Sequence, residues 1–260
     1  MTAVPIRPSA PRPGLSRNGV ILIGVTLALG AVLAAVPAAP RVFVFLFVIS
    51  AWVLSVAVHE FCHAFAAWRA GDHSVNERGY LSFDPLKYTD VGTSIVLPVL
   101  ILALGGIGFP GGAVYLRDDL MRTRGGRAFA SLAGPLGTLA CLIVLAIGFH
   151  VAHTLGLRLF AAALAFLAFL QGTALFINLL PIPGLDGFGV IRPYLPAGVQ
   201  PLVNKAGALV GVALLLLVMF VPGVSDTIFA VGLALTDLAL IPRIAIAAGY
   251  QGFTFWQNFN

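Results

Sequence analysis

The sequence predicts an all-α integral membrane protein with about six transmembrane helices. Hydrophobic residues make up 59% of the 260 residues and charged residues only 10%, whereas a soluble domain usually carries about 25% charged residues. Several uncharged runs reach the roughly 20 residues that a helix needs to cross a bilayer. The sequence lacks the strand alternation of a membrane barrel, and helices satisfy their own backbone hydrogen bonds in lipid.

The sequence of the first part of the chain predicts a tail followed by two helices. Residues 1–17 are basic and proline-rich, and we expect a disordered cytoplasmic tail. The apolar run at 18–36 is too long for a signal peptide and lacks a convincing cleavage site, so we interpret it as a first span. Pro37 and Pro40 then make a turn. A second helix at 42–69 would be about 40 Å long, so it crosses the bilayer with tilt or projects beyond it.

The middle of the chain is less regular. Within the polar stretch 70–90, Tyr80-Leu81-Ser82-Phe83 alternates briefly and could form a short edge strand or part of a β-hairpin. The run 91–116 is long enough to span, but glycines and prolines interrupt it, which makes a re-entrant segment the alternative.

The last part of the chain predicts four further helices, at 128–149, 157–180, 206–222 and 227–247. The last pair could equally be one broken helix. The polytopic membrane domain then covers 18–247, and residues 248–260 form an aromatic tail suited to the membrane interface. The aromatic residues of this tail are Phe253, Phe255, Trp256 and Phe259.

The distribution of basic residues decides between the two topologies. If 91–116 dips into the membrane and returns, only Arg41 and Arg158 of the 15 lysines and arginines lie outside. If it crosses fully, the basic residues divide almost evenly between the two sides. Because basic residues concentrate on the cytoplasmic side of membrane proteins, we expect a re-entrant segment, six spans and cytoplasmic termini.

The second apolar run contains His59-Glu60-Phe61-Cys62-His63. On a helix the two histidines lie one turn apart on the same face, so both imidazoles can reach one metal ion. Glu60 lies beside them, where it can take a proton from a water that the metal activates. Ionisable residues at membrane depth are costly and usually functional, so the motif predicts a zinc site rather than a pair of buried, mutually satisfied side chains.

A third ligand is needed, because catalytic zinc sites usually have three protein ligands. Asp186 is the candidate, since it stands alone in a long uncharged region. Pro181 and Pro183 end the helix before it, and the topology above puts it on the cytoplasmic side together with His59 and His63. Its alternative role is a helix cap. Asn178 could donate a hydrogen bond to a tetrahedral oxyanion, or it could only cap freed backbone carbonyls.

Other metal-binding residue types carry weaker signals. Cys62 and Cys141 both lie in apolar helices, so a disulfide is not implied. Cys62 falls on a different helical face from the two histidines, and we interpret it as a packing residue. His150 and His153 are expected to be ordinary histidines of an outer loop.

The chain resembles the site-2 protease family of intramembrane zinc metalloproteases over roughly residues 45–220. His59-Glu60-x-x-His63 matches the first motif of the family, and Asn178 through Gly187 matches the second. Ala133-Gly134-Pro135 matches a small-residue segment on the helix between them. The pairing of the two metal motifs carries the resemblance.

The stretch 79–87, with the Asp90-Val91-Gly92-Thr93 that follows, is similar to a compact subgroup without extra domains. Two positions depart from the pattern. Many relatives have asparagine where this chain has Thr138, and a Lys-Pro-Val-Pro loop becomes Gly111-Gly112-Ala113-Val114. Neither departure involves a metal ligand, but both bear on substrate preference.

The resemblance implies a zinc metalloendopeptidase of the cell membrane that cuts within or near transmembrane segments of other proteins. Zn²⁺ would be held by His59, His63 and Asp186, and Glu60 would act as the base. Because a helix hides its carbonyls, the substrate must unwind, and residues 79–84 could pair with it as an edge strand. The expected partners are the substrate and the lipid bilayer. Nothing suggests a nucleic-acid partner, since the net charge is +5 and the basic residues that produce it lie beside apolar runs.

Two alternatives to this function stay open. A metal-ion transporter would use the histidines as a transit site and should have a second helix rich in ligands. A catalytically silent membrane scaffold would have no need of Glu60 beside the ligands. A prenyl-protein protease is disfavoured, since such enzymes usually use glutamate as third ligand and no glutamate follows Glu77. Substrate identity and oligomeric state are not encoded in any recognisable pattern.

Overall fold

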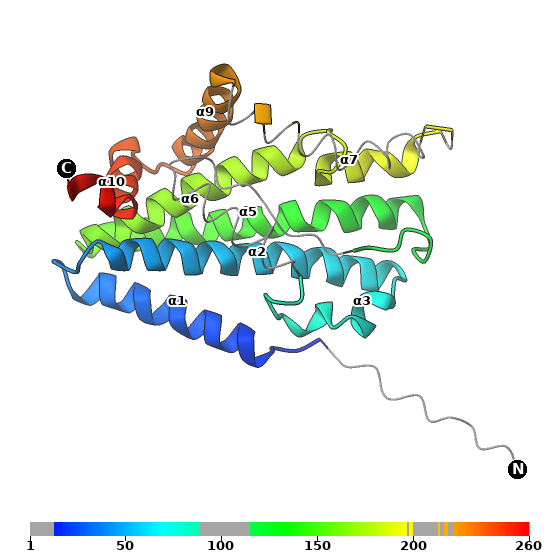
Figure 1. Ribbon diagram of the computed structural model, residues 1–260, viewed down its shortest axis with the longest axis horizontal. Coiled ribbons are helices and arrows are strands. Elements are labelled where there is room, and N and C mark those ends of the chain that lie inside the picture. Colours follow the sequence, from blue (N-terminus) through cyan, green and yellow to red (C-terminus); the bar gives the residue numbers. More distant parts are fainter. Residues whose placement is uncertain are drawn as a thin grey trace, which may run out of the picture.

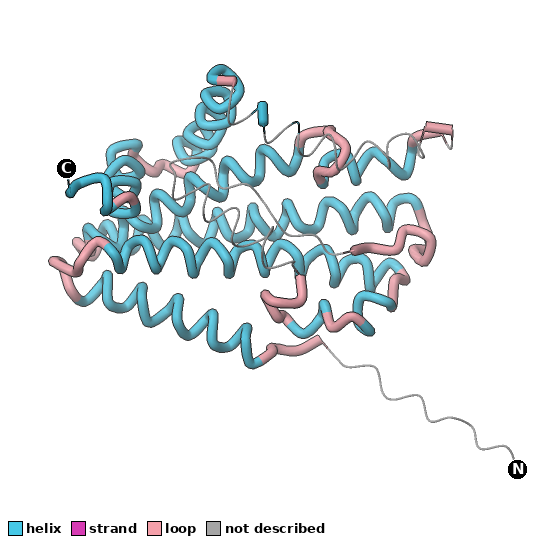
Figure 2. Tube along the Cα trace, in the orientation of Figure 1, coloured by secondary structure: helices cyan, strands magenta, loops and turns pink. Residues whose placement is uncertain are grey.

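The computed structural model describes residues 13–88, 115–196, 198–199, 213, 216–217 and 221–259. Helices and turns make up the described chain, and it contains no strand (Figure 2). Four of its helices are long and apolar enough to cross a membrane: α1 (Arg17–Ala35), α2 (Val42–Ala70), α5 (Arg124–Thr154) and α6 (Arg158–Leu179). The expected helices 18–36, 42–69, 128–149 and 157–180 therefore form, with α5 longer at both ends than predicted.

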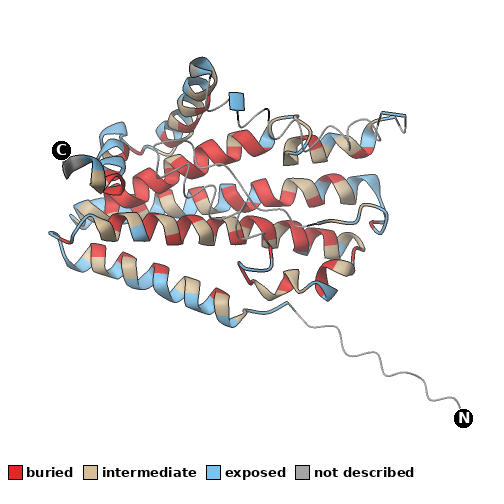
Figure 3. Ribbon diagram, in the orientation of Figure 1, coloured by how far each residue is buried: buried red, intermediate tan, exposed pale blue. Residues whose placement is uncertain are grey.

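Helix α6 lies at the centre of the bundle. It packs against α5 on one side and against α9 (Pro222–Leu238) and α10 (Arg243–Phe253) on another, while α2 packs mainly on α5. In its most apolar window 83% of the α6 residues are buried, compared with 22% in α1. Helix α1 lies against α2 at the edge of the bundle (Figure 1). Its outer side carries exposed residues, coloured pale blue in Figure 3. Among the described residues nothing covers the outer face of α1, so this face can meet lipid.

The local sequence explains where these helices begin and end. The Ser16 hydroxyl accepts a hydrogen bond from the Gly19 amide at 2.9 Å and caps α1. The Thr123 hydroxyl caps α5 in the same way through the Gly126 amide, also at 2.9 Å. Helix α1 ends just before the turn that contains Pro37.

The expected strand at 79–84 is wrong. Residues Tyr80–Ser82 form a short 3₁₀ helix, η1, which follows the short helix α3 (Ser74–Glu77). The backbone turns on both sides of η1, and the carbonyl oxygens of Leu81 and Ser82 already accept hydrogen bonds from Gly14 and Ser16 amides at 3.0 and 2.7 Å. This segment is therefore paired with the beginning of the described chain and does not present a free strand edge.

The expected single helix at 227–247 is also wrong. Helix α9 ends at Leu238 and α10 begins at Arg243. Between them Pro242 cannot continue the hydrogen-bond ladder and disfavours helical backbone in the residue before it. Leu240 adopts a left-handed φ of 57° in the same turn. Most of the expected re-entrant segment at 91–116, most of the expected helix 206–222 and most of the tail 1–17 lie outside the described residues.

Two placements at the end of the bundle opposite His59 differ from the expectation. Helix α5 continues to Thr154, so His150 and His153 lie in its last turns and not in a loop, with His150 Nε2 2.9 Å from the Ala239 carbonyl oxygen. Phe253 is fully buried and packs against Phe45 with ring centroids 5.1 Å apart. It belongs to the core rather than to an interfacial tail. The remaining aromatic residues of that segment lie in a short 3₁₀ helix, η4 (Phe255–Phe259).

Candidate metal centre

The candidate metal centre begins with two histidines in the C-terminal half of α2. His59 and His63 lie one helical turn apart, and their Nε2 atoms are 3.0 Å from each other. Both side chains are buried, with 8% and 6% of their surface exposed. The predicted common face of the helix is therefore observed, and it points into the bundle.

Asp186 completes the group from a different part of the chain. It is the first residue of α7 (Asp186–Ile191), which follows the proline-containing break after α6. Its Oδ2 lies 3.1 Å from His59 Nε2, and its Oδ1 lies 3.2 Å from His63 Nε2. Tight packing fixes this position, because a Cβ on Gly187 would lie 2.2 Å from the Leu179 carbonyl oxygen.

The geometry of these three side chains fits a zinc ion. A tetrahedral zinc with bonds of 2.0–2.1 Å places neighbouring ligand atoms about 3.3 Å apart. The two Nε2 atoms here are 3.0 Å apart, and each has its own Asp186 carboxylate oxygen at 3.1 or 3.2 Å. The buried Asp186 Oδ2 has no hydrogen-bond partner of good geometry among the described residues. Burial alone would raise the pKa of this carboxyl, but the attraction and hydrogen bonds of His63 and His59 together outweigh burial and lower it. A buried carboxylate oxygen of this kind suits a cation.

The outer nitrogen of each imidazole also has a partner. His59 Nδ1 lies 2.8 Å from the Thr138 hydroxyl oxygen, and His63 Nδ1 lies 2.7 Å from the Ala130 carbonyl oxygen. Metal-binding histidines usually donate this second N–H to an oxygen, which fixes the tautomer and leaves Nε2 free for the metal. Both oxygens belong to α5. The sequence shows Thr138 only as a departure from a family pattern, whereas the structure places it against a candidate ligand.

The small-residue segment of α5 allows the close approach of α2. A Cβ on Gly134 would lie 2.1 Å from His63 Nε2 and 2.6 Å from His59 Nε2. No side chain larger than hydrogen fits there without moving an imidazole. The match at Ala133-Gly134-Pro135 therefore has a physical meaning. One turn further along, a Cβ on Gly137 would lie 2.9 Å from Cys62 Sγ, which places this cysteine against α5 and outside the metal group.

Glu60 and Asn178 both border the metal group. They line a cavity of about 430 Å³ together with His59, His63 and Asp186. Glu60 is 3% exposed and Asn178 is 6% exposed. A second, much smaller cavity of about 20 Å³ also borders Glu60 and has room for about one water. Its polar lining residues are Ser55, His59, Glu60, Thr138, Gln171 and Asn178. The structure therefore gathers all five sequence-predicted site residues at one place.

Comparison with known proteins gives several relatives of nearly the same length. Rip2 of Mycolicibacterium smegmatis is 43% identical over 91% of this chain and 92% of its own. Rip2 of Mycobacterium tuberculosis is 43% identical over 82% of each chain. YwhC of Bacillus subtilis is 30% identical over 59% of this chain and 71% of its own.

All three relatives are described as zinc metalloproteases. No family model matches the chain, and no solved structure matches it. The similarity to Rip2 nevertheless extends over most of the sequence, so it does not depend on the short metal motifs alone.

Proposed function

The chain belongs to the site-2 protease family of zinc metalloproteases, and from this premise we propose that it cleaves peptide bonds within or near the transmembrane segments of other membrane proteins. One observation carries the proposal. Two of the three candidate ligands lie on α2, which is long and apolar enough to span a membrane, and α5 and α6, which border the site through Thr138 and Asn178, have the same character. A peptide bond must therefore come to a site between membrane-type helices to be cut.

We assign the ligand role to His59, His63 and Asp186. When bound, zinc supplies a Lewis acid that activates water and polarises a peptide carbonyl. Glu60 follows His59 directly in α2 and lines the same cavity, so it is placed to accept a proton from the attacking water and to pass it to the leaving amine. Thr138 and the Ala130 carbonyl hold the two imidazoles in position.

Asn178 is proposed to donate a hydrogen bond to the oxyanion that develops at the attacked carbonyl. It lies in the last turn of α6 and lines both the metal cavity and the small cavity behind it. An amide donor aimed at developing charge typically contributes about 10²–10³ in kcat. The alternative, a cap on freed carbonyls, would leave kcat of the folded protein nearly unchanged.

We propose a cell-membrane location with both termini in the cytoplasm and the metal centre toward the cytoplasmic side. The distribution of basic residues supports this orientation. The substrate segment must unwind before it is cut, because a helix buries its carbonyls in its own hydrogen bonds.

The alternative of a metal-ion transporter finds no support in the described part of the chain. A transit pathway needs successive ligand clusters, whereas one group of three or more histidine, cysteine or acidic side chains comes together within the described residues. The alternative of a silent scaffold is separated from the protease by the experiment below.

The test compares wild type with Asp186→Ala and Glu60→Gln, each purified in detergent as the full chain. We expect about one zinc per chain in wild type, a large loss of zinc in Asp186→Ala, and full zinc with no cleavage of a transmembrane substrate in Glu60→Gln. Zinc that is unaffected by Asp186→Ala would remove the proposed ligand set. Equal cleavage by wild type and Glu60→Gln would remove the proposed mechanism.

A further inference from the structure

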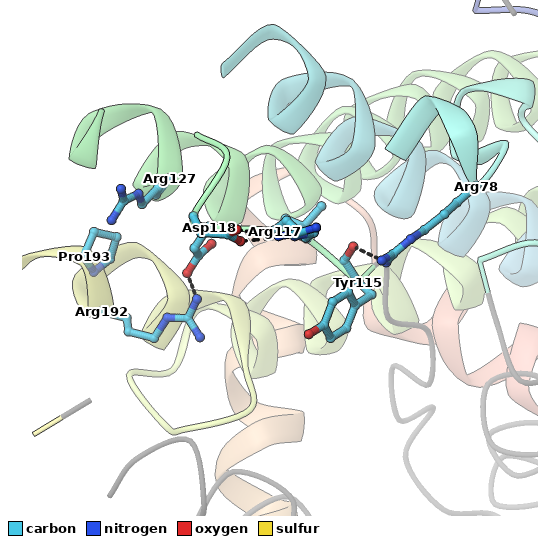
Figure 4. A pocket seen from close by; sticks show the side chains of 9 residues that line it. Arg78, Tyr115, Arg117, Asp118, Arg127, Arg192 and Pro193 are labelled. Carbon is cyan, nitrogen blue, oxygen red and sulfur yellow. Dashed lines mark hydrogen bonds and ion pairs between the residues drawn. The ribbon is translucent and has the colours of Figure 1, made fainter. Parts of the chain in front are cut away.

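A second, larger cleft adjoins the metal cavity. It has a volume of about 1,020 Å³ and is lined by segments that are distant in the sequence (Figure 4). Four residues line both spaces: Tyr115, Leu116, Asp118 and Arg192. Arg192 begins the 3₁₀ helix η3 (Arg192–Tyr194), directly after the helix that starts with Asp186. The two cavities are therefore adjacent, and a chain that extends from the metal centre past these four residues reaches the second cleft.

The cleft is rich in arginine. Arg78, Arg117, Arg127 and Arg192 face Asp118 and Asp119, so its formal charge is positive. Two of the arginines have carboxylate partners, since Arg117 pairs with Asp119 at 2.6 Å and Arg192 pairs with Asp118. Figure 4 shows the second pair as a dashed contact between Arg192 and Asp118.

The other two arginines have no carboxylate partner among the described residues. Arg78 donates a hydrogen bond to the Tyr115 carbonyl oxygen at 3.1 Å, and its guanidinium lies 4.9 Å from the centre of the Tyr115 ring. Arg127 donates a long hydrogen bond of 3.4 Å to the Met121 carbonyl oxygen. Its buried Nε has no partner in the described part of the chain. Within the part of the chain that the structure describes, no carboxylate occupies these two guanidinium groups, and an anion can bind them.

The chemistry of the cleft favours a carboxylate on a peptide. A guanidinium presents a planar fork of N–H groups that matches a carboxylate. The cleft shares lining residues with the cavity of the candidate metal centre, so a substrate chain bound at that centre is the molecule best placed to reach it. Binding of a lipid phosphate group instead is an outcome that the experiment below distinguishes.

We propose that this cleft is a substrate subsite that accepts acidic side chains on one flank of the cleavage position. The proposal rests on the proteolytic function proposed above and names the kind of substrate that function takes. The metal cavity of about 430 Å³ is on the order of 10 Å across, or roughly three residues of extended chain. Acidic residues should therefore act when they lie about three or more residues from the cut.

The experiment uses the zinc-loaded full chain in detergent and a matched set of substrates. Each substrate has the same transmembrane segment, with a flank of three aspartates, three serines or three lysines. We expect kcat/KM to be about threefold to tenfold higher for the acidic flank than for the neutral one, with the basic flank lowest. The preference should shrink as salt rises from about 0.05 to 0.5 M, because the arginines are partly exposed.

Variants locate the effect. The double variant Arg78→Gln/Arg127→Gln should lower the ratio of acidic to neutral kcat/KM to about one. Because both substrates are measured on the same preparation, partial misfolding of the variant lowers both rates and leaves the ratio interpretable. Arg158→Gln is the matched control, since Arg158 is an exposed arginine at the start of α6 and does not line the cleft. It should keep the wild-type ratio.

The possible outcomes distinguish failure of the proposed acidic subsite from failure of the proteolytic function on which it rests. Equal kcat/KM for all three flanks in wild type, or an acidic preference that survives the double variant, would overturn the subsite. An Arg78/Arg127-dependent rate that responds to phosphatidylglycerol vesicles, and not to flank charge, would reassign the cleft to lipid headgroups. Failure to cut any flank, with no difference between wild type and Glu60→Gln, would instead refute the proteolytic function.

Discussion

The two halves of α2 pack against the bundle in different ways. The N-terminal half carries bulky residues, among them Phe47, Val48 and Trp52, which are buried in a core cluster. The C-terminal half carries the histidines and packs with alanines against a small-residue face of α5. One half of the helix fills space, whereas the other leaves space for imidazoles.

This difference shows how a membrane bundle accommodates a polar site. In lipid, helices associate through van der Waals packing and interhelical hydrogen bonds rather than through the hydrophobic effect. Large side chains at the first end fix how the helices sit against each other. Small residues at the second end bring the backbones close enough for His63 to reach the Ala130 carbonyl. The site thus requires small residues where α5 faces α2 as much as it requires the histidines themselves.

The largest effect should come from filling that space. Gly134→Ala places a methyl carbon 2.1 Å from His63 Nε2, so an imidazole or the helix must move. A displacement of about 1 Å in a catalytic group can cost about 10²-fold in rate, and we expect at least that loss in kcat/KM together with reduced zinc content. Cleavage assays and metal analysis of the purified protein measure both.

Gly125→Ala is the matched control for this prediction. Gly125 also lies on α5, and nothing lies within 4 Å of a Cβ placed there. The control should keep zinc and activity, and it should be slightly stabilising because alanine favours a helix. Normal zinc content and activity in Gly134→Ala would show that α2 and α5 are less closely packed at the site than described.

Sequence reasoning predicted the parts of this arrangement that depend on local spacing. Helix positions for α1, α2 and α6 follow from the length of apolar runs and from the residues that interrupt them. The pairing of His59 with His63 follows from one turn of helix. Asp186 was found because a lone acid beside two prolines is conspicuous in an uncharged region.

The parts that sequence reasoning missed depend on contacts between distant segments. Thr138 reaches His59 only because α5 has a particular rotation and depth against α2, which no local pattern encodes. The backbone at 79–84 forms a turn that binds Gly14 and Ser16, and alternation over a few residues does not reveal such pairing. Pro242 itself indicates a break in the helix, but the length of the apolar run around it favoured one continuous helix.

The next largest effect concerns the hydroxyl that holds His59. Thr138→Ala removes the partner of His59 Nδ1 without touching Nε2. Loss of such an outer partner typically weakens metal binding by about 10–100-fold, and we expect this change in zinc affinity measured by competition with a chelator. Thr138→Ser keeps the hydroxyl and should restore most of the affinity. Equal affinity in all three proteins would reduce Thr138 to a packing residue.

A smaller effect on activity is expected at the opposite end of α2. Phe253 is fully buried and stacks near Phe45 and Phe166, with centroids 5.1 and 5.3 Å apart. Phe253→Ala leaves a cavity, and we expect a loss of about 1–3 kcal/mol, less than for a water-soluble core because lipid is itself apolar. The thermal unfolding midpoint in detergent should fall, while zinc per folded chain stays at the wild-type value. Loss of zinc at temperatures where the variant is folded would show that the two ends are coupled.

The smallest effect is expected on the outer face of α1. Leu27 is 68% exposed in the isolated chain, so Leu27→Ala removes few contacts and should change stability by less than about 0.5 kcal/mol. Thermal unfolding and cleavage should match wild type within error, and the result would mark α1 as the lipid-facing edge of the bundle. A clear loss of stability would mean that this face packs against protein rather than lipid. Because the described part of the chain leaves the face uncovered, the packing partner would then be sought first in a second copy, by crosslinking between cysteines introduced on α1.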